Sequence, residues 1–307
     1  MKRVTLNRFP FPAAWLTVVL AASGALALAQ QPQPLPNMGQ QITPLAPKGA
    51  TYQTLNPGLA PPADQWLVSN AVTSVVSPEP AHKTMLVMTS GYNRFNTTNV
   101  QPPAGTNPWN PAFSNEYVFI YDISNSVPVQ KQAVQIATTY NGIVWDPSGS
   151  AFYVSGCAYD LIHVVTPNSA GVWTDQLSQA LQLGHKLGNG LNIVPNGATA
   201  VNSQVGVYAC AAGIAISQDG QTLVAANYYN DSISVFTGGL GHWTPVAGPN
   251  PAIPGIDLRP GKSALNPQPG VPGGEYPLWV AIKGDDTAYI SSIRDREIVV
   301  VNFASTL

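Results

Sequence analysis

The histidines are the residues of this sequence best suited to acid–base chemistry or to metal binding. The 307-residue chain has four, and no two of them lie at a metal-ligand spacing: His82, His163, His185 and His242. His185 lies in the glycine-rich segment 183–190 (LGHKLGNG), which makes it the best single candidate for chemistry. That segment lacks the Walker pattern, and the chain has no G-x-S-x-G nucleophile elbow. We therefore predict no catalytic residue, no metal ligand and no cofactor.

Short segments rich in Tyr, Asn, Arg and Asp recur along the chain and offer a different chemistry. Their side chains can stack on a polar ligand and form hydrogen bonds with it. Together with His185, we select them as candidate ligand-binding residues: Tyr92, Arg94, Tyr159, Asn227, Tyr228, Arg294 and Asp295. The competing interpretation is structural, because Asn and Asp are also the residues that tight turns require. It is favoured for Asn230 and Asp231.

Composition indicates turn-rich β structure and excludes several classes of partner. Charged residues make up only 9% of the chain, whereas it has 29 Pro, 27 Gly and 12 Tyr. The net charge is −2, and three of the 13 basic residues are Lys2, Arg3 and Arg8. Without them the chain has 10 basic against 15 acidic residues and no basic run. We therefore expect no nucleic-acid partner, since such binding needs a Lys and Arg footprint.

The first 29 residues have the features of a secretory signal peptide. A positive start precedes the uncharged apolar run 13–29, which ends in the cleavage pattern Ala27-Leu28-Ala29. The alternative is an uncleaved anchor, for which this run is short. We predict export to the periplasm or beyond, with no integral membrane segment after cleavage. Residues 30–65 are rich in Pro and Gln, and we interpret them as a linker in preference to a proline-rich ligand.

Self-comparison finds an internal repeat in the rest of the chain. Residues 142–165 align without gaps with residues 213–236, and Gly142 matches Gly213. A third copy covers 278–301, and a weaker fourth begins near Thr73 and resumes after an insertion at 116–121. Each copy predicts three short strands; in the second copy these are 213–217, 222–226 and 232–236. Segments 129–138 and 172–183 are candidate fourth strands.

Tandem units of three or four antiparallel strands predict an all-β fold, a β-propeller of antiparallel four-stranded blades. About four blades are visible in residues 66–307. The alternative, a β-sandwich with chance similarity, is disfavoured by the gap-free matches at turns and core positions.

Segment 224–236 (VAANYYNDSISVF) and the preceding 213–220 (GIAISQDG) resemble the repeat of the YVTN β-propeller family. This resemblance covers about residues 70–307 and implies the fold, with little about function. Such propellers usually have seven blades, so we favour an incomplete propeller over a closed four-bladed ring. Segment 270–301 also resembles exported bacterial proteins that join a propeller to a downstream phosphoesterase of the alkaline-phosphatase superfamily. That activity is not carried over, because no Asp and His cluster with metal-ligand spacing occurs.

In a propeller blade the loops after the second and fourth strands emerge on one face. The long inserts, at 93–115, 183–212 and 237–277, all collect there. We call it the insertion-rich face and weigh it evenly as a binding face or as plain surface loops. Cys157 and Cys210 fall on this face in adjacent blades, so we predict a disulfide between them. The alternative is two buried free thiols.

Two functions of different classes follow from these observations. The favoured one is an exported, non-catalytic binding or scaffold module, with a small polar ligand or a protein partner on the insertion-rich face. The alternative is a hydrolase, either a lactonase-like propeller or the N-terminal propeller of a metal-dependent phosphoesterase.

Overall fold

The computed structural model describes residues 33–34, 41–42, 53–58, 68–90, 116–185, 192–193, 205–206, 208–248, 254–258 and 275–303. The chain forms two units, Met1–Leu55 and Asn56–Leu307. In the first unit β1 (Gln33–Pro34) pairs antiparallel with β2 (Gln41–Ile42). The predicted signal peptide lies outside the described residues, as do the candidate residues Tyr92 and Arg94.

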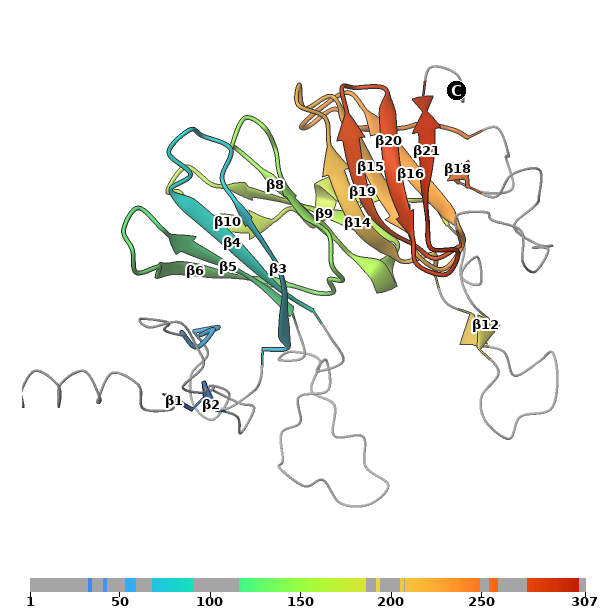
Figure 1. Cartoon of the computed structure of the whole chain (residues 1–307). Coiled ribbons are helices and arrows are strands. Elements are labelled where there is room, and N and C mark those ends of the chain that lie inside the picture. The colour runs from blue at the N-terminus through green and yellow to red at the C-terminus, as the bar shows by residue number, and fades with distance from the viewer. Residues whose placement is uncertain are drawn as a thin grey trace, which may run out of the picture. The chain divides into compact units, whose positions relative to one another are not determined.

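The second unit contains four main antiparallel sheets in a β-propeller-like arrangement, as predicted (Figure 1). Sheet 1 consists of β3 (Asn70–Val76), β4 (Thr84–Ser90), β5 (Glu116–Asp122) and β6 (Val129–Ile136). Sheet 2 consists of β7 (Ile143–Trp145), β8 (Phe152–Ser155), β9 (Leu161–Pro167), β10 (Trp173–Asp175) and β11 (Leu181–Gln182). In sheet 1 and among β7–β10 of sheet 2, successive strands of the chain are neighbours, whereas β11 pairs with β9.

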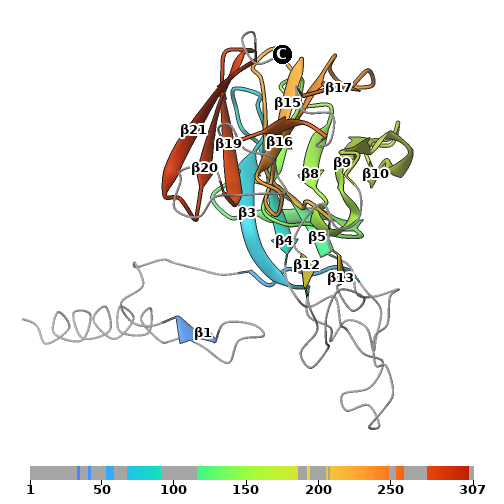
Figure 2. The same cartoon turned by 90° about the vertical axis from the view of Figure 1, so that its right-hand side faces the viewer.

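The last two main sheets repeat this order. Sheet 3 consists of β14 (Ala211–Ile216), β15 (Thr222–Asn227), β16 (Ser232–Thr237), β17 (Thr244–Pro245) and β18 (Ile256–Asp257). Sheet 4 consists of β19 (Pro277–Lys283), β20 (Thr287–Ser292) and β21 (Glu297–Asn302), drawn in red in Figure 2. In the part of the chain between β11 and β14, β12 (Asn192–Ile193) pairs with β13 (Val205–Gly206).

The predicted inner strands are confirmed, whereas the outer strands depart from the expected four per sheet: sheets 2 and 3 have five strands each and sheet 4 has three described strands. The strands expected at 213–217, 222–226 and 232–236 are β14, β15 and β16. The single fourth strand expected at 172–183 is instead two short strands, β10 and β11, which both pair with β9. Five residues, 176–180, stand opposite only two residues of β9, so they leave the ladder and form the 3-10 turn Leu177–Gln179.

Apolar cores fill the spaces between consecutive sheets, because the strands bury both of their faces. On β9, Ile162 and Val164 pack in the core with sheet 3, whereas Val165 packs with residues of sheet 1. A third core joins sheets 3 and 4. A sheet that packs against neighbours on both faces buries apolar area on two sides. This burial stabilises the fold by roughly 25 cal/mol per Å² of apolar area removed from water.

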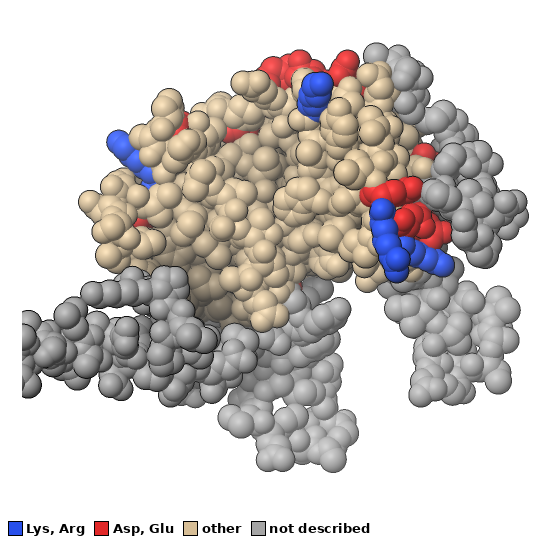
Figure 3. Space-filling model, viewed as in Figure 1, with Lys and Arg blue, Asp and Glu red and all other residues tan. Residues whose placement is uncertain are grey.

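Sheet 4 has one face that is apolar and exposed. Ser291 of β20 pairs with Trp279 of β19 on one side and with Ile298 of β21 on the other. On the same face, Tyr289 of β20 pairs with Val300 of β21. The large side chains of this face are 37–69% exposed: Trp279, Tyr289, Ile298 and Val300. Charged side chains are sparse over the described surface drawn in Figure 3, as the low charged fraction predicts.

The buried Tyr153 makes stability sensitive to alkali. Its hydroxyl donates to Asp146 Oδ2 at 3.0 Å and accepts from Trp243 Nε1 at 3.2 Å. Burial, with the Asp146 carboxylate as a smaller cause, raises the pKa of this phenol above its usual range. Since the folded pKa exceeds the unfolded value of about 10, this contribution is complete below that pH and is lost as the pH rises above it.

We therefore expect the urea midpoint to fall between about pH 9 and pH 11, and to fall less in Tyr153→Phe. Burial also raises the pKa of Tyr117 and of Tyr121, so the substitution should reduce the fall without abolishing it. Tyr159→Phe, at an exposed position, is the matched control. An identical alkaline fall in Tyr153→Phe and in the unmodified protein would contradict the assignment.

Candidate functional site

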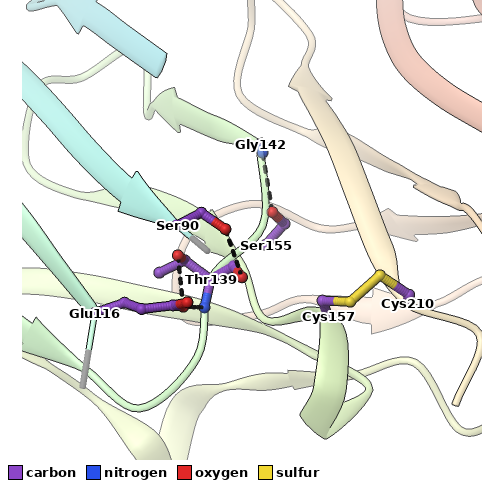
Figure 4. The surroundings of a disulfide bond; sticks show 7 residues. All are labelled: Ser90, Glu116, Thr139, Gly142, Ser155, Cys157 and Cys210. Atoms are coloured by element: carbon purple, nitrogen blue, oxygen red, sulfur yellow. Dashed lines mark hydrogen bonds between the residues drawn. A yellow bond between two sulfur atoms is a disulfide. The ribbon is translucent and has the colours of Figure 1, made fainter. Parts of the chain in front are cut away.

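Small buried polar residues fix the ends of the second strands of the main sheets. Each main sheet ends its second strand with one: Ser90, Ser155, Asn227 and Ser292. Ser90 Oγ donates to Thr139 O at 3.1 Å, and Ser155 Oγ accepts from Gly142 N at 2.9 Å (Figure 4). Ser292 Oγ donates to Glu275 O. These three contacts tie the ends of β4, β8 and β20 to segments that lead into the first strand of a sheet.

Aspartates in the following turns also hold connecting segments. Asp160 and Asp231 occupy equivalent repeat positions and both have left-handed backbones, with φ of 55° and 57°. The Asp160 carboxylate accepts from His185 N at 2.6 Å, and that of Asp231 accepts from Tyr276 N at 3.0 Å. Asp295 likewise accepts from Glu275 N at 3.0 Å. The turn interpretation of Asp231 therefore has a direct structural basis, and the candidate Asp295 makes a contact of the same kind.

The ring of His185 is engaged on both sides. Its Nδ1 lies 2.8 Å from Asp160 Oδ1, and its Nε2 lies 3.2 Å from the carbonyl oxygen of Pro254. The residue is only 6% exposed. These contacts connect a turn of sheet 2 with the connection after it and with the segment that precedes β18. In this arrangement neither ring nitrogen is available to a substrate.

Four tyrosines form a half-buried cluster where three connections meet. The ring of Tyr228, in the turn after β15, lies 5.8 Å from Tyr140, 5.0 Å from Tyr229 and 5.2 Å from Tyr276, between centroids. Tyr140 lies before β7, and Tyr276 directly precedes β19. We call these residues the tyrosine cluster. Tilted and edge-on aromatic contacts of this kind stabilise the site.

A guanidinium group lies beside this cluster. Arg294 is 59% exposed at its side chain, and its Nη1 lies 2.9 Å from Glu275 Oε2. Glu275 directly precedes Tyr276 of the tyrosine cluster. The structure thus brings Arg294, Asp295 and Tyr228 into one region through the short segment 275–276. An exposed Arg paired on one side keeps donors that can bind a carboxylate or a phosphate.

The remaining candidates are separate from this region or buried. Tyr159 is 47% exposed in the 3-10 turn Cys157–Tyr159. Asn227 is fully buried, and its Nδ2 donates to Ser232 and Ser234 hydroxyls at 2.9 Å each. Its Oδ1 has no hydrogen-bond partner. Asn227 therefore lies beneath the surface, next to Tyr228, without direct exposure.

Tyr140 and Tyr276 were not among the sequence candidates, although the repeat contains a signal for them. Tyr140 and Tyr276 differ by the sum of the two repeat offsets, so they occupy the same repeat position, two residues before Gly142 and Leu278. The self-comparison began at those two residues and stopped short of the tyrosines. Extending each copy by two residues would have found the pair.

A buried acid near the disulfide was also missed. Glu116 is 2% exposed, and its Oε2 accepts from Thr139 N and lies 2.7 Å from Thr139 Oγ1 (Figure 4). Thr139 Oγ1 is also 2.5 Å from Thr89 O. Glu116 opens β5 after the long insertion, so its neighbours come from distant segments. The contacts assign it to fixing the connection between sheets 1 and 2.

The predicted disulfide is confirmed between Cys157 and Cys210, which are 53 positions apart (Figure 4). Within the described part of the chain, no group of three or more His, Cys, Asp or Glu residues is placed to hold a metal ion. The helices described there are all too short or too polar to cross a membrane.

No protein-family model matches the chain, and no curated protein matches it. Solved structures of β-propeller proteins do resemble it. A protein from Lactobacillus plantarum has 15% identity and a TM-score of 0.44, covering 88% of this chain and 63% of that one. The periplasmic gluconolactonase of Pseudomonas aeruginosa has 12% identity and a TM-score of 0.41, covering 89% and 62%.

An auxiliary nutrient binding protein from Bacteroides ovatus has 13% identity and a TM-score of 0.39, covering 75% of this chain and 58% of that one. The chain thus spans less than two thirds of the length of each of these three structures. Similarities at this level transfer no activity to the chain.

Proposed function

We propose that this chain is an exported, non-catalytic binding or scaffold module that takes a polar ligand on its insertion-rich face. The observation that carries the proposal is the tyrosine cluster with Arg294 beside it. Tyr140, Tyr228 and Tyr276 come from three different connections and meet at one place. Aromatic rings with a neighbouring guanidinium suit a flat or anionic polar ligand, either a small molecule or a polar segment of a protein.

The contacts of His185, the best sequence candidate for chemistry, favour binding over catalysis. Both ring nitrogens of His185 already contact protein oxygens, so a proton transfer to substrate would first have to break a buried contact. The candidate aspartate Asp295 is likewise bonded to the backbone of Glu275. These contacts assign the polar residues of the site to holding the connections in place.

Export and membership of the YVTN-repeat family belong to the same proposal. The Cys157–Cys210 disulfide fits an oxidising compartment, in agreement with the signal-peptide pattern of residues 1–29. The repeat motifs at 213–220 and 224–236 support the family. We place the mature protein in the periplasm or outside the cell.

A thermal-shift screen with small carboxylates, phosphates and sugars tests the binding proposal. We expect at least one compound to raise the melting temperature of the unmodified protein, because ligands that bind only the folded state stabilise it. Tyr228→Leu and Arg294→Ala should each reduce that shift. Ile298→Thr, at a 69% exposed position on sheet 4, is the control and should keep it.

The hydrolase alternative is tested on the same preparation. With δ-gluconolactone or p-nitrophenyl phosphate, with and without added divalent metal, we expect no rate above the uncatalysed reaction. Saturable turnover that falls at least about tenfold in His185→Ala would overturn the non-catalytic proposal.

A further inference from the structure

A histidine–aspartate pair is buried between sheets 1 and 2. His163 Nδ1, on β9, lies 2.7 Å from Asp175 Oδ2, on β10. The imidazole is fully buried, and the Asp175 side chain is 10% exposed. His163 shares its face of β9 with Val165, which belongs to the apolar core against sheet 1. A polar pair in such a place calls for an explanation, since burying a charge is costly.

The repeat itself shows that this histidine departs from the pattern of the fold. The row that crosses the first three strands of sheet 2 ends at His163, after Ile143 and Val154. The equivalent rows of sheets 1, 3 and 4 end at Phe119, Ser234 and Val299. The other three sheets therefore fill this position with a side chain that does not ionise.

Two atoms of the pair have no hydrogen-bond partner: His163 Nε2 and Asp175 Oδ1. The contact between the two residues needs one ring proton, on Nδ1, and Nε2 meets no acceptor for a second proton. The ion pairs of the described residues give Asp175 no Lys or Arg. The carboxylate therefore has a buried acceptor atom without a partner, and a histidine as its one ionic partner among the described residues.

A groove of about 440 Å³ lies beside this carboxylate, between the outer strands β6 and β10. Asp175 contributes its only charged side chain, and its other walls are largely apolar, with Ala133, Val134, Ala137, Trp173 and Leu177 among them. The half-buried ring of Trp173 is held 5.5 Å from Trp145 and 5.3 Å from Phe152. Gln132 bonds both the N–H and the C=O of Trp173 and so fixes this side of the groove.

We propose that the groove binds a primary ammonium group carried on an aliphatic chain, as in a free diaminoalkane or a lysine side chain. The ammonium pairs with the carboxylate of Asp175, whose side chain is 10% exposed and lines the groove. The aliphatic chain packs on the apolar walls, and the Trp173 ring adds a cation–π contact. This site is separate from the tyrosine cluster, and its ligand does not depend on the proposed function of that face.

Calorimetric titration of the whole chain with 1,5-diaminopentane and with N-acetyl-lysine amide tests the proposal. We expect saturable binding of one or both amines, and the tighter of the two identifies the source of the ammonium. The uncharged analogue 1-pentanol should bind at least about tenfold more weakly, since it has the chain without the charge. No binding of either amine, or equal binding of 1-pentanol, would overturn the proposal.

Two variants locate the binding at Asp175. Asp175→Asn keeps the shape and removes the charge, and we expect affinity to fall at least about tenfold. Asp286→Asn, in an exposed turn, changes net charge by the same amount and should leave affinity unchanged. If Asp175→Asn fails to fold, Leu177→Lys replaces it, because Leu177 is 61% exposed at the groove. Its tethered ammonium should compete with the added amine, and unchanged affinity in the folded variant would sink the assignment.

Discussion

Replacing both cysteines, Cys157→Ala with Cys210→Ala, should lower the free energy of unfolding by about 4 kcal/mol. The disulfide joins residues 53 positions apart, so its loss releases a long loop in the unfolded chain. It also ties the 3-10 turn after β8 to the residue before β14, and Cys210 O accepts from Tyr228 N at 2.9 Å. Losing the bond should therefore loosen the connection from sheet 2 to sheet 3 as well as destabilise the fold.

Urea unfolding with and without reductant measures this effect. The unmodified protein should lose stability on reduction, whereas the double variant should be insensitive to reductant. Each single variant should be about as unstable as the double one, because either removes the same bond. A double variant as stable as the oxidised protein would show that the disulfide contributes nothing.

Adding a methyl group at Gly142 or Gly213 should cost about 3 kcal/mol. A Cβ at Gly142 would lie 2.3 Å from Ala212 O and 2.9 Å from Ile214 N. One at Gly213 would lie 2.5 Å from Leu278 O and 2.6 Å from Trp279 Cα. Both clashes are with the backbone of the next sheet's first strand, which cannot move aside without separating the sheets. Gly142→Ala and Gly213→Ala are thus overpacking changes at the joints of the fold.

Gly171→Ala is the matched control for these two variants. A Cβ there meets no atom within 4 Å, so only its positive φ of 77° opposes the substitution. We expect a cost of about 1 kcal/mol for this backbone effect. Denaturant midpoints of the three variants check the comparison, and equal losses in all three would mean that close sheet packing is not the reason for the glycines.

The fold could be predicted from the sequence because the repeat encodes it locally. Gly142 and Gly213 align in the repeat on sequence identity alone. The structure explains the identity, because the backbone of the next sheet's first strand lies too close to either position for a Cβ. The disulfide followed from placing Cys157 and Cys210 in that repeat. Strand alternation likewise located β16, whose residues Ile233 and Val235 are buried.

The side-chain contacts between different strands and connections could not be predicted, because the repeat pattern gives no information on which side chains meet in space. The partners of His185 are Asp160, 25 residues away, and Pro254, 69 residues away. His163 meets Asp175 only because β10 turns back along β9. The sequence around His163 shows only its apolar neighbours on β9 and gives no sign of the charged partner.

Hydrogen–deuterium exchange in the presence of a stabilising compound from the thermal-shift screen tests the central claim most directly. The account predicts slower exchange at 138–142, 226–231 and 275–277, the segments that hold the tyrosine cluster. Slower exchange confined to the short turns at 147–149, 218–220 and 284–286 would contradict it, because those turns lie between first and second strands at the opposite ends of the sheets.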